Sequence, residues 1–150
     1  MLFLNAQKAI CNNISCSSKE VLGINTEIPD IFLWLRTYLV LNSEAAKKLS
    51  SFLKSKGELL PIRVDNKDMY IFNCLQFGKE NKALCMKKYL NGIEDGYKTL
   101  VFDDEDASSK LIFKSNLVGP MLFVTEEFKS LCDESKLKGF RFEPNLLAVF

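Results

Sequence analysis

The sequence predicts an α+β domain with a largely antiparallel sheet of about six to eight strands and two main helices. Two segments, near residues 44–56 and 125–135, carry apolar residues at helical spacing. Most of the strand-like runs follow one another in hairpin order, separated by short polar turns. The chain has 150 residues, of which 47% are hydrophobic and 26% charged, as expected for one globular domain.

The N-terminal part has the least clear pattern in the sequence. Residues 1–28 predict an arm or a first strand, and residues 29–150 predict the α+β domain. Asn and Ser side chains cluster over residues 12–18, and Pro29 closes the segment. No internal repeat and no linker is visible, so the chain is interpreted as one domain overall.

A strand followed by a helix is predicted next. Residues 34–41 are rich in aromatic, β-branched and aliphatic side chains, which favours one strand. Ser43 is the expected N-cap of the helix over residues 44–56, and Gly57 is expected to supply the left-handed residue after its end. The apolar stripe of this helix comprises Ala46, Leu49 and Leu53.

Two hairpin strands are expected at residues 58–64 and 69–75. The polar residues 65–68 between them predict a turn. Pro61 lies inside the first strand, and proline cannot donate to a sheet ladder, so this strand is expected at an edge or a bulge.

Further strand character appears at residues 83–90, 98–102 and 111–113, with a strong turn signal at Asn91-Gly92. Four consecutive acidic residues separate the last two runs and predict the solvated tip of a loop. They are Asp103, Asp104, Glu105 and Asp106.

The C-terminal third predicts a strand, a helix and a strand. Residues 121–124 are a short apolar run, and Thr125 can cap the helix that follows. Glu126 and Glu127 suit its N-terminal end because carboxylates are stabilised there by the helix dipole. Residues 140–143 alternate Phe, Arg, Phe and Glu, which is typical of a half-buried strand.

Composition removes several classes of function. The chain has no histidine, which excludes Ser-His-Asp and Cys-His catalysis and His-containing zinc sites. No phosphate-binding glycine loop and no calcium loop occurs, so no cofactor is expected. With 20 basic and 19 acidic residues, the net charge of +1 gives no reason to expect nucleic acid or a membrane as partner.

Cysteine usage and the N-terminus predict a cytoplasmic protein. The five cysteines are odd in number and contain no CxxC pair, so free thiols in a reducing compartment are expected. Polar residues interrupt the apolar start of the chain, which therefore does not look like a signal peptide. No run approaches the length of a membrane span.

Two features are candidates for binding a protein partner. The acidic residues 103–106 could be a solvated loop or an anionic patch that a basic partner recognises. Trp34 could be a core residue or an interface residue, because exposed aromatic side chains contribute much of the free energy of association.

Two segments near the C-terminus carry a resemblance to a known family. Residues 119–129 read Gly-Pro-Met-Leu-Phe-Val-Thr-Glu-Glu-Phe-Lys, and residues 137–144 read Leu-Lys-Gly-Phe-Arg-Phe-Glu-Pro. Together they resemble the end of a bacterial immunity-protein family from polymorphic toxin systems, the eleventh in the usual numbering and formerly a domain of unknown function. Its typical ending is matched by Gly139, Phe142 and Pro144, with Phe140 alternating with Phe142.

The resemblance implies a small cytoplasmic protein that binds a cognate toxin domain and blocks it stoichiometrically, without catalysis. The matched residues have backbone and packing explanations, so they do not mark the toxin-binding surface. If the toxin is a basic nuclease, acidic residues 103–106 could mimic phosphate. Two alternatives stay open: an enzyme that reverses a modification made by the toxin, and a non-catalytic adaptor.

Overall fold

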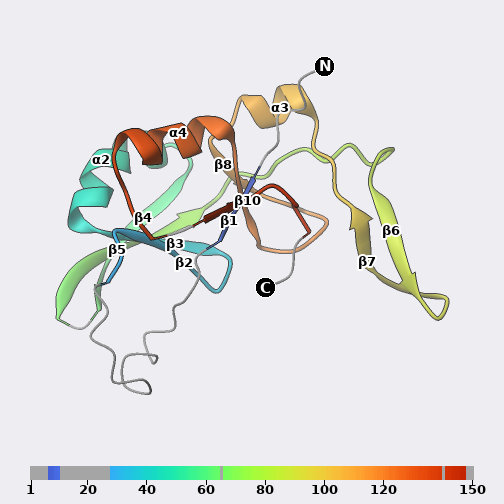
Figure 1. The fold of residues 1–150 in the computed structure, drawn as a ribbon, viewed down its shortest axis with the longest axis horizontal. Helices are drawn as coiled ribbons and strands as arrows, with labels where there is room; N and C mark the ends of the chain where they lie inside the picture. Colours follow the sequence, from blue (N-terminus) through green and yellow to red (C-terminus); the bar gives the residue numbers. More distant parts are fainter. Residues whose placement is uncertain (1–6, 11–27, 65, 140, 148–150) are drawn as a thin grey trace.

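The computed structural model describes residues 7–10, 28–64, 66–139 and 141–147, and its fold is α+β with antiparallel sheets, as predicted (Figure 1). The helices are α2 (Ser43–Leu53), α3 (Asp104–Ser108) and α4 (Glu126–Glu134). The strands are β1 (Gln7–Ile10), β2 (Ile31–Trp34), β3 (Tyr38–Asn42), β4 (Gly57–Val64), β5 (Lys67–Cys74), β6 (Met86–Leu90), β7 (Ile93–Thr99), β8 (Ile112–Lys114), β9 (Leu122–Val124) and β10 (Arg141–Glu143).

The sequence predicts one sheet, but the described strands form two four-stranded sheets and one separate hairpin. The first sheet has the order β10-β1-β9-β8 and the second the order β2-β3-β5-β4. Residues 76–78 run beside β8 and link the sheets: Lys114 N donates to Gln76 O, and Gly78 N donates to Lys114 O, both at 2.8 Å. The second sheet ends at β4, so Pro61 lies on an edge strand as predicted.

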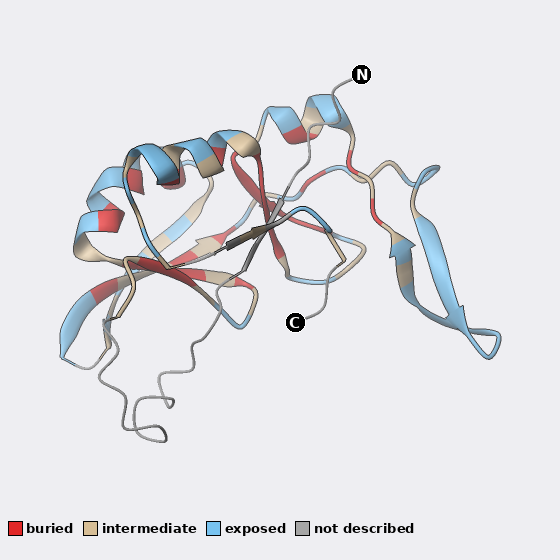
Figure 2. Ribbon diagram, in the orientation of Figure 1, coloured by how far each residue is buried: buried red, intermediate tan, exposed pale blue. Residues whose placement is uncertain are grey.

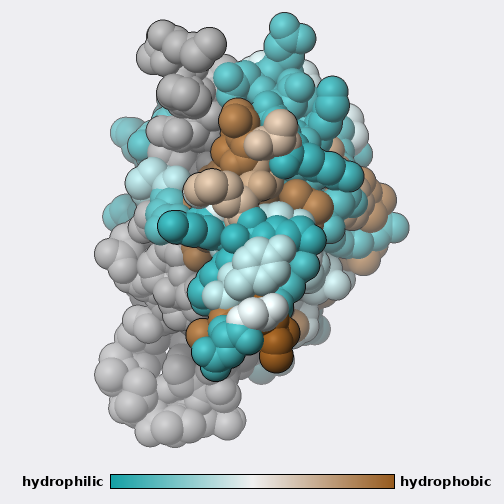
Figure 3. All heavy atoms as spheres, turned by 90° about the vertical axis from the view of Figure 1, so that its right-hand side faces the viewer, coloured by the Kyte–Doolittle hydropathy of each residue, from teal (hydrophilic) through white to brown (hydrophobic). Residues whose placement is uncertain are grey.

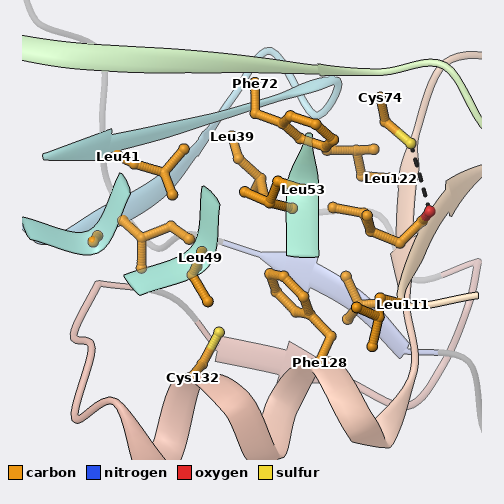
Figure 4. Close-up of a cluster of buried hydrophobic side chains, with 14 of the residues drawn as sticks. Leu39, Leu41, Leu49, Leu53, Phe72, Cys74, Leu111, Leu122, Phe128 and Cys132 are labelled. Carbon is orange, nitrogen blue, oxygen red and sulfur yellow. Dashed lines mark hydrogen bonds between the residues drawn. The ribbon is translucent and has the colours of Figure 1, made fainter. Parts of the chain in front are cut away.

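The main core lies between the sheets and the two longer helices. Figure 4 shows Leu49 and Leu53 of α2 pointing toward the same cluster as Phe128 and Cys132 of α4. Sheet side chains such as Phe72 complete the cluster, and each fully buried side chain of this size contributes roughly 1.5–3 kcal/mol. The apolar stripes predicted for both helices are therefore confirmed.

A second core of aromatic rings lies beneath α3. The ring centroid of Phe102 is 4.9 Å from that of Phe113 and 5.2 Å from that of Phe123. A Cβ atom on Gly78 would lie 2.5 Å from the Phe113 ring, so glycine lets the loop after β5 approach this cluster. Ala107 of α3 is buried in the same cluster and fixes the helix over it.

The ends of α2 differ from the prediction. Asn42, not Ser43, is the N-cap: its Oδ1 accepts from Ala45 N at 2.8 Å, and asparagine caps as well as serine. The helix ends at Leu53, and Gly57 opens β4 instead of ending the helix. Glycine is needed there because a Cβ atom would lie 2.1 Å from Asn73 O of the neighbouring strand.

Three strand predictions need correction. Residues 34–41 are not one strand, because β2 and β3 meet at a turn over Leu35 and Arg36. The strand expected at 98–102 lies earlier, as β7, and it pairs with β6 instead of the run at 111–113. That run forms β8, which pairs with β9. β4 and β5 form a hairpin as predicted, but Lys67 and Asp68 of the expected turn are paired strand residues. The Asn91-Gly92 turn connects β6 and β7, as predicted.

Of the N-terminal arm or strand predicted over residues 1–28, residues 1–6 and 11–27 lie outside the described residues. β1 at residues 7–10 is an N-terminal strand, and β9, α4 and β10 appear where the C-terminal third predicts them. Thr125 is the N-cap of α4 by position, but its buried hydroxyl makes no capping bond. No helix in the described ranges is long and apolar enough to cross a membrane.

Candidate protein-binding surfaces

The hairpin of β6 and β7, here called the arm, stands away from the rest of the molecule (Figure 1). All five residues of β6 and the first four of β7 are exposed (Figure 2). Leu90 and Ile93 flank the turn and are 60% and 74% exposed, and Tyr89 is 60% exposed. Figure 3 shows hydrophobic residues gathered at the lower end of this hairpin. Apolar side chains grouped on a projecting element are typical of a binding surface.

Contacts within the arm hold its shape. Asn91 and Gly92 have φ angles of 51° and 81°, as a type I′ turn requires, and this turn matches the twist of the two strands. Lys87 Nζ lies 2.8 Å from the Glu94 carboxylate, and Lys88 Nζ lies 2.7 Å from that of Asp95. The hydrogen bond to Glu94 raises the pKa of Lys87. The charges therefore neutralise one another across the strands, and the apolar tip is left facing solvent.

The arm was not among the binding residues predicted from the sequence, although one signal pointed to it. Successive residues of a strand face opposite sides, so the pairs Lys87-Lys88 and Glu94-Asp95 place charge on both faces of the hairpin. A hairpin charged on both faces cannot bury either face in a core.

The acidic run forms the first turn of α3, not the tip of a loop. Asp103 is the N-cap and accepts from Asp106 N at 3.1 Å. Asp106 makes a close ion pair with Lys110, and its carboxylate accepts from Lys79 N at 2.7 Å. Successive carboxylates suit this position because they cap the helix and interact favourably with its dipole.

Only the middle two acidic residues are available to a partner. Asp104 and Glu105 are exposed, whereas Asp103 and Asp106 are half-buried and tie α3 to the loop after β5. The anionic surface at this position is therefore smaller than four solvated carboxylates would give.

We expect Asp106→Asn to lower the free energy of unfolding at pH 7 by about 1 kcal/mol. Asp104→Asn with Glu105→Gln should change it by less than about 0.5 kcal/mol. The hydrogen bond with Lys110 lowers the pKa of Asp106, so its stabilisation is present above the unfolded pKa of about 3.9 and is lost as the pH falls through the folded pKa. Urea titrations at pH 7 and pH 3 should therefore show the effect of Asp106→Asn shrinking at low pH.

Trp34 is the last residue of β2 and is 42% exposed. Its ring lies 6.0 Å from that of Tyr38, across the turn that joins β2 to β3. Figure 1 places this turn in the lower half of the view and α3 at the top, so the structure does not bring Trp34 and the acidic run together.

The residues of the resemblance have packing roles. Gly139 has a φ angle of 131°, and a Cβ atom there would lie 2.2 Å from Ile31 O and 2.4 Å from Pro29 Cβ. Phe142 packs half-buried against the main core, and exposed Pro144 follows β10. Phe140 lies outside the described residues.

Two thiols and one carboxylate among the described residues are engaged in the structure. Burial raises the pKa of Cys74 and raises that of Cys132 to about 12, so both thiols are protonated at neutral pH. The Glu80 carboxylate accepts from Ser115 Oγ at 2.6 Å and from Asn116 N at 2.7 Å. No group of three Cys, Asp or Glu that could hold a metal ion occurs in the part of the chain that the structure describes.

An open groove of about 660 Å³ lies beside Glu80. Among the residues that line the groove, Lys79 Nζ lies 3.6 Å from the Asp103 carboxylate. The groove is lined by Phe77, Gly78, Lys79, Glu80, Asn81, Lys82, Asp103 and Asn116. The carboxylates of Glu80 and Asp103 already accept hydrogen bonds from the chain itself. The groups of the groove that remain available to a partner are therefore chiefly lysine ammonium groups and the Phe77 ring.

No protein-family model matches the chain, and no curated protein matches it.

Proposed function

We propose that this chain is an immunity protein that binds a cognate bacterial toxin domain in the cytoplasm and neutralises it by stoichiometric contact. The observation that carries the proposal is the arm, a solvent-exposed hairpin whose apolar tip comprises Tyr89, Leu90 and Ile93. The resemblance over residues 119–144 gives independent support and supplies the class of partner.

The arm has the properties expected of an element that enters a cleft. Exposed aromatic and aliphatic side chains that become buried on association contribute most of the binding free energy. The Asn91-Gly92 turn fixes the conformation in advance, so little entropy is lost on binding. The two cross-strand ion pairs satisfy the charged groups, so the arm can enter an apolar site without leaving a charge unpaired.

The proposal is tested by co-expressing the tagged chain with the untagged C-terminal domain of the toxin encoded beside it. We expect an equimolar complex by size-exclusion chromatography with light scattering, and survival of cells that make both proteins. Survival without a complex would instead indicate an enzyme that reverses the damage. Neither complex nor survival would indicate an adaptor with another partner.

A further inference from the structure

The turn between β2 and β3 has a backbone that its residues do not favour. Thr37 N donates to Trp34 O at 3.1 Å, and the two residues between them, Leu35 and Arg36, have φ angles of 52° and 61°. This combination of positive φ angles is the pattern of a type I′ turn, for which Asn-Gly is preferred. The arm places Asn91-Gly92 at its two positive-φ positions, in a two-residue loop, whereas three residues separate the paired Trp34 and Tyr38 here.

The turn is held in place, and its first residue faces solvent. Leu122 N of β9 donates to Arg36 O at 3.1 Å, which fixes the turn against the first sheet. Leu35 is 69% exposed and Trp34 is 42% exposed, so burial in the core does not explain either side chain. Backbone strain that packing does not require is typical of positions where function selects the residues.

A shielded ammonium lies beside this turn. Lys114 of β8 is only 8% exposed, and its Nζ lies 5.9 Å from the centroid of the Tyr38 ring, which in turn packs against Trp34. Its hydrogen bond is to a neutral acceptor, Asn73 Oδ1, at 3.0 Å. Within the described residues, no carboxylate lies within ion-pair distance of this ammonium.

The charge is therefore incompletely compensated by the residues that the structure describes. Glu58 reaches only the amide of Asn73, whose Nδ2 donates to its carboxylate at 3.1 Å. An ammonium has three N–H donors, and a lysine this buried ordinarily pairs with a carboxylate. Phe77, which is 49% exposed, is bridged to Lys114 through the backbone and so lies beside it along the sheet.

We propose that this surface, formed by Trp34, Leu35, Phe77 and Lys114, is a second contact for the toxin domain and receives a carboxylate flanked by apolar side chains. The inference rests on the proposed function and names the chemistry that the toxin offers here. The carboxylate pairs with the Lys114 ammonium, and the aromatic rings and Leu35 exclude water from the pair. An Asn-Gly turn would relieve the backbone strain, but it would remove the Leu35 side chain from this contact.

The test uses two variants and the toxin domain that co-purifies with the wild-type chain. Leu35→Asn with Arg36→Gly places Asn-Gly, the pair that the arm uses, at the two positive-φ positions of this turn. We expect its Tm to rise by roughly 3–6 °C and its affinity for the toxin domain, by calorimetry, to fall about tenfold or more. Lys114→Met keeps the length of the stem without the charge. It should not lower Tm, and it should weaken binding roughly thirtyfold or more.

The matched control is Lys47→Met, which removes one charge from the solvent side of α2 and should bind as the wild type does. If the wild-type chain binds the toxin domain and both test variants bind equally well, the second contact is wrong while the proposed function stands. If the wild-type chain does not bind the toxin domain, both the second contact and the proposed function are wrong. A concentration-dependent dimer that Leu35→Asn with Arg36→Gly abolishes would assign the surface to a second copy and overturn the proposal.

Discussion

Replacing Leu90 and Ile93 of the arm by threonine should weaken binding of the toxin domain by about a hundredfold or more. Each side chain flanks the turn of a projecting hairpin, and truncating a central apolar residue of an interface commonly costs about 2 kcal/mol or more. Threonine keeps the strand preference of the two positions, so the hairpin itself should persist. Binding is measured by calorimetry with the co-purified toxin domain.

The same variant should leave the fold unchanged. Leu90 and Ile93 pair with each other and are exposed, so their replacement should change the free energy of unfolding by less than about 0.5 kcal/mol. Phe52→Ser, which removes an exposed apolar side chain from α2, is the matched control and should bind with wild-type affinity. Wild-type binding by the threonine variant would show that the arm is not the contact, whatever else the complex contains.

Local patterns that determine local structure could be predicted from the sequence. The apolar stripe of α2, the Asn91-Gly92 turn and the edge position of Pro61 each follow from one kind of interaction: packing, backbone preference or a missing hydrogen-bond donor. Each involves only residues near in sequence, so the pattern alone is sufficient.

Errors arose where contacts distant in sequence decide the structure. Gly57 resembles a helix terminator, but its real constraint is the carbonyl of Asn73. Residues 34–41 look like one strand because Leu35 and Arg36 carry no turn signal, and the turn forms despite their preference. The acidic run looks like a loop because its partners Lys79 and Lys110 are not apparent from the run itself.

The candidate surfaces were predicted only in part, because exposure is a property of the assembled fold. Trp34 and the acidic run were identified by residue type, yet only half of the acidic run faces solvent. Leu90 and Ile93 are residue types that a buried strand would also use. The sequence around them does not reveal that they remain exposed in the fold. Lys114 is in a short apolar run, so its burial and its lack of a carboxylate partner among the described residues appear only in three dimensions.

Gly139→Ala should lower the free energy of unfolding by about 3 kcal/mol or more. Two costs combine: the φ angle of 131° disfavours any L-residue, and the added Cβ atom would overlap Ile31 O and Pro29 Cβ. The contact can relax little, because Lys138 N donates to Asp30 Oδ2 at 3.0 Å and Ile31 N donates to Lys138 O at 3.3 Å. Urea unfolding followed by circular dichroism gives the value.

Gly119→Ala distinguishes the cost of the positive φ angle from the cost of the Cβ overlap. Gly119 belongs to the other half of the resemblance and has a φ angle of 80°, but no atom lies within 4 Å of an added Cβ. It should therefore cost only the conformational penalty, about 1 kcal/mol. Equal effects for the two variants would mean that Gly139 is required by its backbone angle alone. A larger effect for Gly139, with toxin binding retained by the fraction that stays folded, would assign the resembling segment to stability. Recognition would then be expected at the arm and at the turn between β2 and β3, where several of the exposed apolar side chains lie.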